Sequence, residues 1–205
     1  MAASKTAKPK PQKPKVQTGS YHHGDLRQAL LDAARTVLET ASPEAVTLKS
    51  LAQMLGVSQS APYRHFETRD AVLAAVAADG FVRFREALSA ARGEAPTDPF
   101  EQACLAYVAF GRANRGVYKL MFASPIVTAS QDGALGGAAD AAFQFLIQGV
   151  ETHASAGQAL TVATWVWSTL HGLVMLEADG FLKRGDDSAA TIAAVVHRLS
   201  RAIRS

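Results

Sequence analysis

The sequence has few of the features on which metal binding, catalysis or secretion depend. It contains one cysteine, Cys104, so it can form neither an intramolecular disulfide nor a multi-cysteine metal site. No run of about 18 apolar residues occurs, and no apolar stretch follows the N-terminal lysines, so we expect no membrane span and no secretory signal. A phosphate-binding loop, a nucleophile elbow and a paired acid and base are also missing. We therefore expect a cytoplasmic protein that is not an enzyme and has no metal or cofactor.

The basic charge of the chain is concentrated in its first 20 residues. These hold five lysines and no acidic residue, whereas the whole chain has a formal net charge of +3, so residues 21–205 together carry −2. Residues 1–20 have almost no side chains to bury, and we expect a disordered basic tail. Such a tail either neutralises nucleic-acid phosphates or only keeps the protein soluble, and the sequence leaves both possibilities open.

Apolar residues recur at spacings of three and four through the remainder of the chain, and no convincing alternating strand pattern is present. This periodicity predicts an all-α protein. About nine helices are expected, near residues 25–41, 47–55, 59–66, 68–91, 100–114, 117–122, 139–155, 157–182 and 188–204. The Gly- and Ala-rich stretch 128–138 is predicted to be a loop. We interpret residues 21–70 as a three-helix domain and residues 71–205 as a second helical domain.

The stretch from Val46 to Asp70 is typical of a helix-turn-helix. Thr47 stands at the start of one short helix, Gly56 at its end, and Ser58 at the start of a second short helix over 59–66. In this motif the second helix enters the DNA major groove by its N-terminal part. Gln59, near that end, can bond bidentately to an adenine edge. The polar side chains that the apolar pattern leaves on the outside are Thr47, Lys49, Ser58, Gln59, Ser60, Tyr63, Arg64, His65 and Arg69.

The runs YHHGDLRQALLDAA and TLKSLAQMLGVSQSAPYRHFETRDAVLAAVA resemble the TetR/AcrR repressor family over residues 21–80. Further along, Trp167, His171 and Gly172 in WSTLHGL resemble the Trp-His-Gly element of one subgroup of TetR C-terminal domains. The resemblance implies an Ω-shaped homodimer of all-helical subunits. It also implies a DNA surface that includes Thr47, Lys49, Gln59, Ser60, Ala61, Tyr63, His65 and Arg69.

One position departs from the family pattern. Pro62 stands where the family often has an aliphatic residue, and proline fits only the first turn of a helix. We therefore expect a short recognition helix with a shifted start.

The second domain is rich in aromatic side chains, and two interpretations apply to them. They either line a pocket for a small ligand or pack as an ordinary core. The candidate effector contacts are Tyr107, Phe110, Tyr118, Met121, Phe122, Phe143, Trp167 and His171. For His171 in particular, the alternatives are donation to a ligand and a buried bond to the backbone.

The last two predicted helices, 157–182 and 188–204, are apolar on more than one face, which predicts burial against a second subunit. Together these features predict a homodimeric repressor that binds a palindromic operator in double-stranded DNA and is released by a small-molecule effector. Two alternatives remain: a small-molecule-binding or enzymatic helical bundle without sequence-specific DNA binding, and a DNA-binding protein without an effector.

Overall fold

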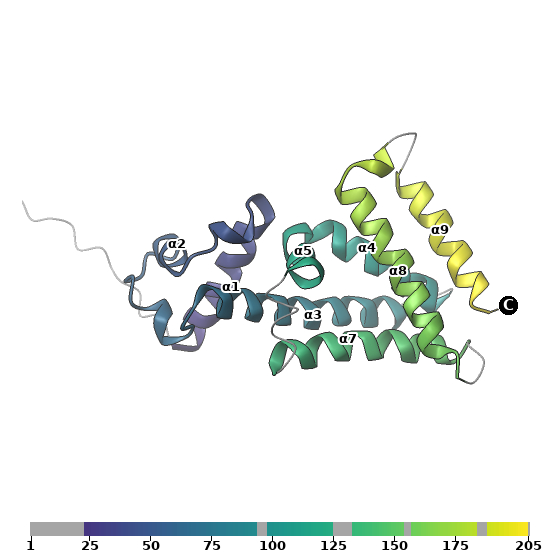
Figure 1. The fold of residues 1–205 in the computed structure, drawn as a ribbon, viewed down its shortest axis with the longest axis horizontal. Coiled ribbons are helices and arrows are strands. Elements are labelled where there is room, and N and C mark those ends of the chain that lie inside the picture. Colours follow the sequence, from purple (N-terminus) through teal and green to yellow (C-terminus); the bar gives the residue numbers. More distant parts are fainter. Residues whose placement is uncertain (1–22, 94–97, 125–132, 154–156, 184–187, 205) are drawn as a thin grey trace, which may run out of the picture.

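The computed structural model describes residues 23–93, 98–124, 133–153, 157–183 and 188–204. Within these ranges the chain forms eight α-helices and three short 3₁₀ turns, and no strand, which confirms the predicted all-α class. The basic tail and much of the predicted loop 128–138 lie outside the described residues. Figure 1 shows an elongated molecule, with the N-terminal helices at one end and α9 at the other.

The N-terminal end contains α1 (His23–Thr40), η1 (Pro43–Ala45), α2 (Leu48–Met54), η2 (Pro62–Arg64) and the beginning of α3 (Arg69–Gly93). These elements share a small core in which Leu30, Leu51 and Leu73 are fully buried. The guanidinium of Arg27 covers the ring of Phe66 at 5.3 Å from its centroid, which holds the residues that follow η2 against α1. The predicted three-helix arrangement is therefore present, except that its third helix is reduced to a 3₁₀ turn.

The long helix α3 joins the two ends of the molecule. Its 25 residues span about 37 Å at the usual helical rise, and Figure 1 shows it running from the N-terminal helices into the C-terminal ones. Its first turns bury Val72 and Leu73 in the N-terminal core, and its later turns bury Phe81 and Phe84 among the C-terminal helices. One continuous helix thus belongs to both cores.

The C-terminal helices are α4 (Pro99–Ala113), α5 (Arg115–Ala123), α7 (Ala134–Glu151), α8 (Ala159–Ala178) and α9 (Ser188–Ala202), with η3 (Phe181–Lys183) before α9. Helices α4, α5 and α7 pack against α3, and α8 lies against α4 and α7. Three predicted boundaries are wrong: α7 begins at Ala134, inside the expected loop, and ends at Glu151, and α8 ends at Ala178 instead of near residue 182. Alanine favours helix, and the buried Leu135 and Ala142 hold this segment against the core despite its glycines.

Candidate functional site

Helix α2 begins and ends as its sequence predicts. The Thr47 hydroxyl accepts a hydrogen bond from the Ser50 backbone N–H at 3.0 Å, and the Ser50 hydroxyl lies 3.1 Å from the Thr47 N–H, which completes a capping box. Gly56 follows the helix with φ at +65°, a conformation that glycine adopts without strain. These two ends fix the direction in which the chain enters the next segment.

Residues 58–66, here called the recognition segment, form a compact turn in place of the predicted α-helix over 59–66. The backbone N–H groups of His65 and Phe66 both donate to the Pro62 carbonyl, at 2.9 and 3.0 Å. Pro62 has no N–H of its own, and the Ser58 hydroxyl lies 3.2 Å from the Ser60 hydroxyl instead of capping a helix. The side chains of Pro62 and Phe66 are buried and anchor the segment.

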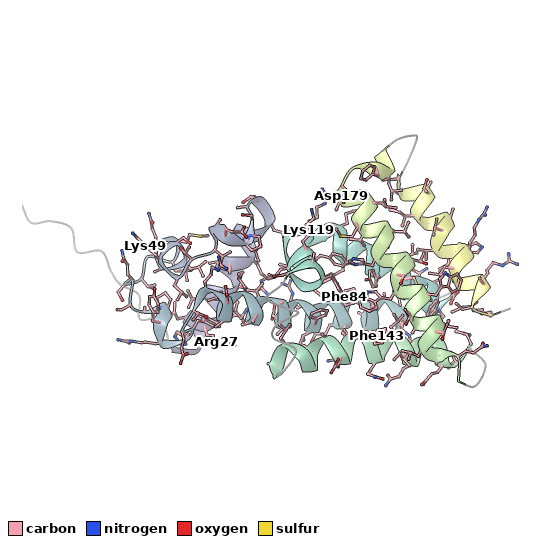
Figure 2. All side chains as sticks on the ribbon, viewed as in Figure 1. Arg27, Lys49, Phe84, Lys119, Phe143 and Asp179 are labelled. Atoms are coloured by element: carbon pink, nitrogen blue, oxygen red, sulfur yellow. The ribbon has the colours of Figure 1, made fainter. Side chains whose placement is uncertain are left out.

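Exposed polar side chains form a row at the end of the molecule opposite α9. Lys49 belongs to this row, and Figure 2 shows it projecting outward. Tyr63 is 58% exposed, an unusual state for a large aromatic residue. The exposed members of the predicted surface are Thr47, Lys49, Ser58, Gln59, Ser60, Tyr63 and Arg64, while Ala61 is half-buried.

Two predicted surface residues are less free than the others. The Arg69 guanidinium is paired with Asp70 at 2.9 Å, so part of its charge is neutralised. His65 is half-buried, and its Nε2 atom is buried without a hydrogen-bond partner. The sequence pattern did not separate these two from the exposed set.

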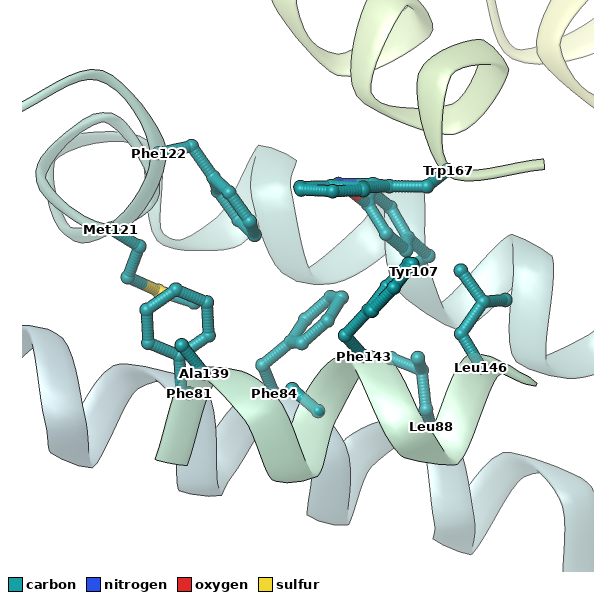
Figure 3. A pocket seen from close by; sticks show the side chains of 11 residues that line it. Phe81, Phe84, Leu88, Tyr107, Met121, Phe122, Ala139, Phe143, Leu146 and Trp167 are labelled. Atoms are coloured by element: carbon teal, nitrogen blue, oxygen red, sulfur yellow. The ribbon is translucent and has the colours of Figure 1, made fainter. Parts of the chain in front are cut away.

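A cavity of about 240 Å³ lies among the C-terminal helices, shown in Figure 3. It is lined by side chains from α3, α4, α5, α7 and α8, nearly all of them apolar. The lining residues are Phe81, Phe84, Leu88, Tyr107, Met121, Phe122, Ala139, Ala142, Phe143, Leu146 and Trp167.

The aromatic walls of this cavity pack against one another, some pairs edge to face and others tilted. The Phe84 ring lies 4.8 Å from the Tyr107 ring at 84°, and the Phe143 ring lies 5.3 Å from that of Trp167. Such pairs add to the energy of burial and restrict ring rotation. The cavity is therefore bounded by side chains that hold one another in place.

Behind one wall runs a chain of polar groups. The Tyr107 hydroxyl lies 3.0 Å from the Tyr118 hydroxyl, which lies 2.8 Å from Nδ1 of His171. Burial raises the pKa of both tyrosines, further for Tyr107 through the neighbouring Tyr118, while a hydrogen bond from Trp167 acts in the opposite sense. Burial also lowers the pKa of His171. Both tyrosines and His171 are therefore uncharged at neutral pH.

Helix α5 contacts both the cavity and the N-terminal domain. Met121 and Phe122, near its C-terminal end, line the cavity. Near its N-terminal end, Gly116 lies against the carbonyl group of Leu38 in α1. An ion pair between Arg35 and Asp79 also joins α1 to α3.

One side of α8 faces away from the other helices. This outward face of α8 consists of Thr161, Trp165, Ser168, Gly172 and Leu176, spaced at three and four residues. Trp165 is 47% exposed and Leu176 45% exposed, and a Cβ added at Gly172 would meet no atom within 4 Å. Length and composition alone would allow α8 to cross a membrane, but Val166, Leu170 and Val174 on its other side are buried in the core.

Two family models match separate parts of the sequence. Residues 30–76 match the model described as bacterial regulatory proteins, tetR family, and residues 100–199 match that of the tetracyclin repressor-like C-terminal domain. The chain belongs to the tetR family. It is thus a transcription regulator with a helix-turn-helix DNA-binding domain and a C-terminal ligand-binding domain. Its assignment to the Trp-His-Gly subgroup stays a prediction.

Solved structures agree with this tetR-family membership. A protein with unknown function from Rhodococcus sp. RHA1 is 30% identical, with a TM-score of 0.78 and coverage of 91% of this chain and 99% of that one. A tetR-family regulatory protein from Rhodococcus RHA1 is 17% identical, with a TM-score of 0.66 and coverage of 87% and 96%. A TetR variant from Acinetobacter baumannii AYE, solved with minocycline, is 19% identical, with a TM-score of 0.56 and coverage of 87% and 97%. No curated protein sequence matches the chain.

The cavity of this tetR-family chain includes five of the eight effector contacts predicted from the sequence: Tyr107, Met121, Phe122, Phe143 and Trp167. The other three do not line it. Phe110 packs against Phe84, with ring centroids 5.2 Å apart, while Tyr118 and His171 lie behind the Tyr107 wall. Nδ1 of His171 pairs with the Tyr118 hydroxyl and not with the backbone, while donation by His171 to a ligand stays a prediction.

Apart from Phe143, the side chains that α3 and α7 contribute to the cavity were not predicted from the sequence. These are Phe81, Phe84, Leu88, Ala139, Ala142 and Leu146. One sequence signal could have indicated the contribution of α3. This helix is apolar on more than one side, whereas a helix on the surface of one domain needs only one apolar stripe.

Proposed function

We propose that the chain is a homodimeric repressor that binds a palindromic operator through its recognition segments and releases it when a small molecule occupies the cavity. The observation that carries this proposal is the shared helix α3. Its first turns support the recognition segment, and Phe81, Phe84 and Leu88 in its later turns line the cavity. A ligand that alters the packing around these rings therefore acts on the same rigid element that positions the DNA-binding end.

The DNA contacts proposed here are those of the exposed polar row, with His65 and Arg69 as secondary members. Thr47 and Lys49 lie in the first turn of α2, where backbone N–H groups and a cation suit a phosphate. Gln59, Ser60, Ala61 and Tyr63 lie in the recognition segment, where they would face base edges in the major groove. Because residues 21–205 carry a formal net charge of −2, we also assign phosphate contacts to the basic tail.

The second subunit is proposed to cover the outward face of α8 together with α9. A glycine inside a helix costs about 1 kcal/mol relative to alanine, and Gly172 has no neighbour within the subunit that requires it. The exposed residues of α9 include Ala190, Ala193 and Ala194, which are also small. Small side chains on both helices allow a close approach of a partner's helices, with Trp165 and Leu176 as apolar anchors.

A ligand releases the protein from the operator if the protein with an occupied cavity favours a different spacing of its two recognition segments. A ligand shifts such an equilibrium only by its differential affinity for the two states. Structural relatives solved with imidazole and with minocycline support ligand binding by this fold. Helix α5 provides a second path, since it contacts both the cavity and α1.

The test is selection of bound duplexes from a random DNA pool by the purified full-length chain at moderate salt. We expect enrichment of a palindrome whose half-sites are separated by about one helical turn or a multiple of it. A Tyr63→Ala and Gln59→Ala double variant should lose the enrichment, whereas Val82→Ala, a change at an exposed position of α3, should retain it. Absence of any enriched sequence with the unaltered protein would overturn the proposal.

A further inference from the structure

Resting on the proposed role of the cavity as an effector site, we propose that its ligand is a neutral aromatic molecule that donates a hydrogen bond to the Tyr107 oxygen. The argument depends on the size of the cavity, the absence of charge among its lining residues and the direction of the hydrogen bonds behind its wall.

The size of the cavity limits the ligand. A cavity of about 150 Å³ holds benzene, so 240 Å³ accommodates a molecule on the order of ten non-hydrogen atoms. Six of the lining residues are phenylalanine, tyrosine or tryptophan, which offer ring faces and edges to a flat ligand. A fused two-ring aromatic molecule has this size and shape.

The lining carries no charged side chain. A carboxylate ligand would therefore lose its hydration without gaining a counter-ion. A cation would gain contacts with ring faces, but these do not replace hydration in a dry site as an acidic partner would. Arg92, which could pair with an anion, lines a neighbouring crevice that shares Leu88, Tyr107 and Leu146 with the cavity, and there it covers the ring of Phe145 at 5.2 Å. The cavity thus favours a neutral molecule.

Tyr107 and Trp167 are the lining residues with a nitrogen or oxygen in the side chain, and their hydrogen-bonding capacity decides the polar group of the ligand. The indole N–H of Trp167 can only donate. At the other end of the chain, imidazole nitrogen is a better acceptor than phenol oxygen, and phenol is the better donor. We therefore assign the Tyr118 hydroxyl as the donor to Nδ1 of His171 across 2.8 Å, with the ring proton on Nε2.

The direction of this hydrogen bond determines which donors and acceptors stay free at the cavity. Because the Tyr118 proton is used on His171, the Tyr107 hydroxyl must donate to the Tyr118 oxygen across 3.0 Å. The proton of Tyr107 is then occupied, and the Tyr107 oxygen retains a lone pair. A hydroxyl or N–H group on the ligand can use that lone pair, whereas a ligand that only accepts hydrogen bonds cannot.

Isothermal titration calorimetry of the full-length chain with four probes tests the inference. The probes are 2-naphthol, which donates; 2-methoxynaphthalene, which only accepts; 2-naphthoate, an anion; and N-methylquinolinium, a cation. We expect 2-naphthol to bind about tenfold more tightly than 2-methoxynaphthalene, the difference expected for one hydrogen bond, and the two ions to bind more weakly than either.

Two variants that each remove one hydroxyl group should respond differently. Tyr107→Phe removes the acceptor, so the preference for 2-naphthol should disappear without a gain for 2-methoxynaphthalene. Tyr118→Phe frees the Tyr107 proton to donate into the cavity, so 2-methoxynaphthalene should bind several-fold more tightly than it does to the unaltered protein. Circular dichroism tests whether each variant is folded. If a variant is unfolded, the comparison of the four probes on the unaltered protein still tests the inference.

Equal or tighter binding of 2-methoxynaphthalene or of either ion by the unaltered protein overturns the inference, as does the absence of binding by all four probes. These results are independent of the DNA selection. A chain that selects an operator but binds no probe retains the proposed function and loses this inference. A chain that binds 2-naphthol as expected but selects no DNA retains the ligand class and loses its regulatory role.

Discussion

Gly116 in α5 lies so close to Leu38 in α1 that a Cβ at position 116 would come within 1.9 Å of the Leu38 carbonyl oxygen. No L-amino acid with a side chain fits this contact unless the two helices separate. The backbone of the cavity helix α5 is therefore in direct contact with the backbone of α1 in the DNA-binding domain, and no side chain lies between them. The contact makes the position of α1 sensitive to any movement of α5.

Gly116→Ala is expected to destabilise the protein by about 1–3 kcal/mol, because overpacked sites cost that much even after the backbone has adjusted. Urea unfolding followed by circular dichroism measures the change. Gly137→Ala in α7 is the matched control, since a Cβ there meets no atom and alanine favours the helix. Equal stability of the two variants would contradict the proposed helix contact.

Arg112 and Glu177 connect α4 to α8 by two hydrogen bonds, of 3.0 and 2.7 Å. Glu177 is only 7% exposed, so removing its partner leaves a poorly solvated carboxylate. We expect Arg112→Leu to cost about 1–3 kcal/mol, less than for a fully buried pair because Arg112 is itself 42% exposed.

The Arg112→Leu and Glu177→Leu double variant supplies the control for this ion pair. It should be more stable than the sum of the two single changes predicts, because neither charge is then left without its partner. Chemical denaturation of the four proteins gives the coupling energy. Strict additivity would show that the two side chains contribute independently.

Asp98 forms the N-cap of α4 and also contacts α9. Burial would raise the pKa of Asp98, but hydrogen bonds from Ser200, from the backbone and from Arg204 outweigh it, so the pKa is lowered overall. The Ser200 hydroxyl donates to Asp98 at 2.6 Å. Since the folded pKa is below the unfolded value of about 3.9, the carboxylate stabilises the fold above that pH. The stabilisation is lost as the pH falls through the folded pKa.

Asp98→Asn should therefore be less stable than the unaltered protein at neutral pH, and the difference should shrink below about pH 4. Thermal unfolding across a pH series measures this. Asp140→Asn, at an exposed position of α7, should show no comparable pH dependence. A difference that stays constant from neutral to acidic pH would exclude a role for the Asp98 charge.

Trp165→Lys combined with Leu176→Lys is expected to give a monomer, because two charges would be buried in the proposed subunit contact. Light scattering after size-exclusion chromatography measures the mass in solution. Val82→Lys, a change at another exposed apolar position, should leave the dimer intact. Retention of the dimer by the double variant would place the interface elsewhere.

Lys49 and Gln59 should affect DNA binding in different ways. Lys49→Ala removes a proposed phosphate contact, so affinity for all sequences should fall and the salt dependence should decrease by about one unit of slope. Gln59→Ala should leave the slope unchanged and relax the sequence preference at one position of each half-site. Fluorescence anisotropy over a salt series, with the selected operator and single-base variants, distinguishes the two. Identical effects of both changes would contradict the assignment.

Local patterns were sufficient for much of the helical organisation. The position of Thr47, the glycine at 56 and the apolar spacing of α3 predicted the helix-turn-helix and its neighbours, because caps, turns and helical faces depend on residues near one another in sequence. The recognition segment was only partly predicted. Pro62 indicated a shortened helix, but the reduction to a 3₁₀ turn depends on how Pro62 and Phe66 are buried against α1 and α2.

The sequence by itself determined that this is an all-helical chain with a DNA-binding motif at one end and an aromatic-rich domain at the other. The tertiary structure decided which aromatic rings line a cavity and which fill the core, since Phe84 and Phe110 have the same chemistry and touch each other, yet only Phe84 lines the cavity. It also decided that His171 pairs with Tyr118. Residues 53 positions apart meet only when several helices pack together, and helical periodicity carries no information about such a meeting.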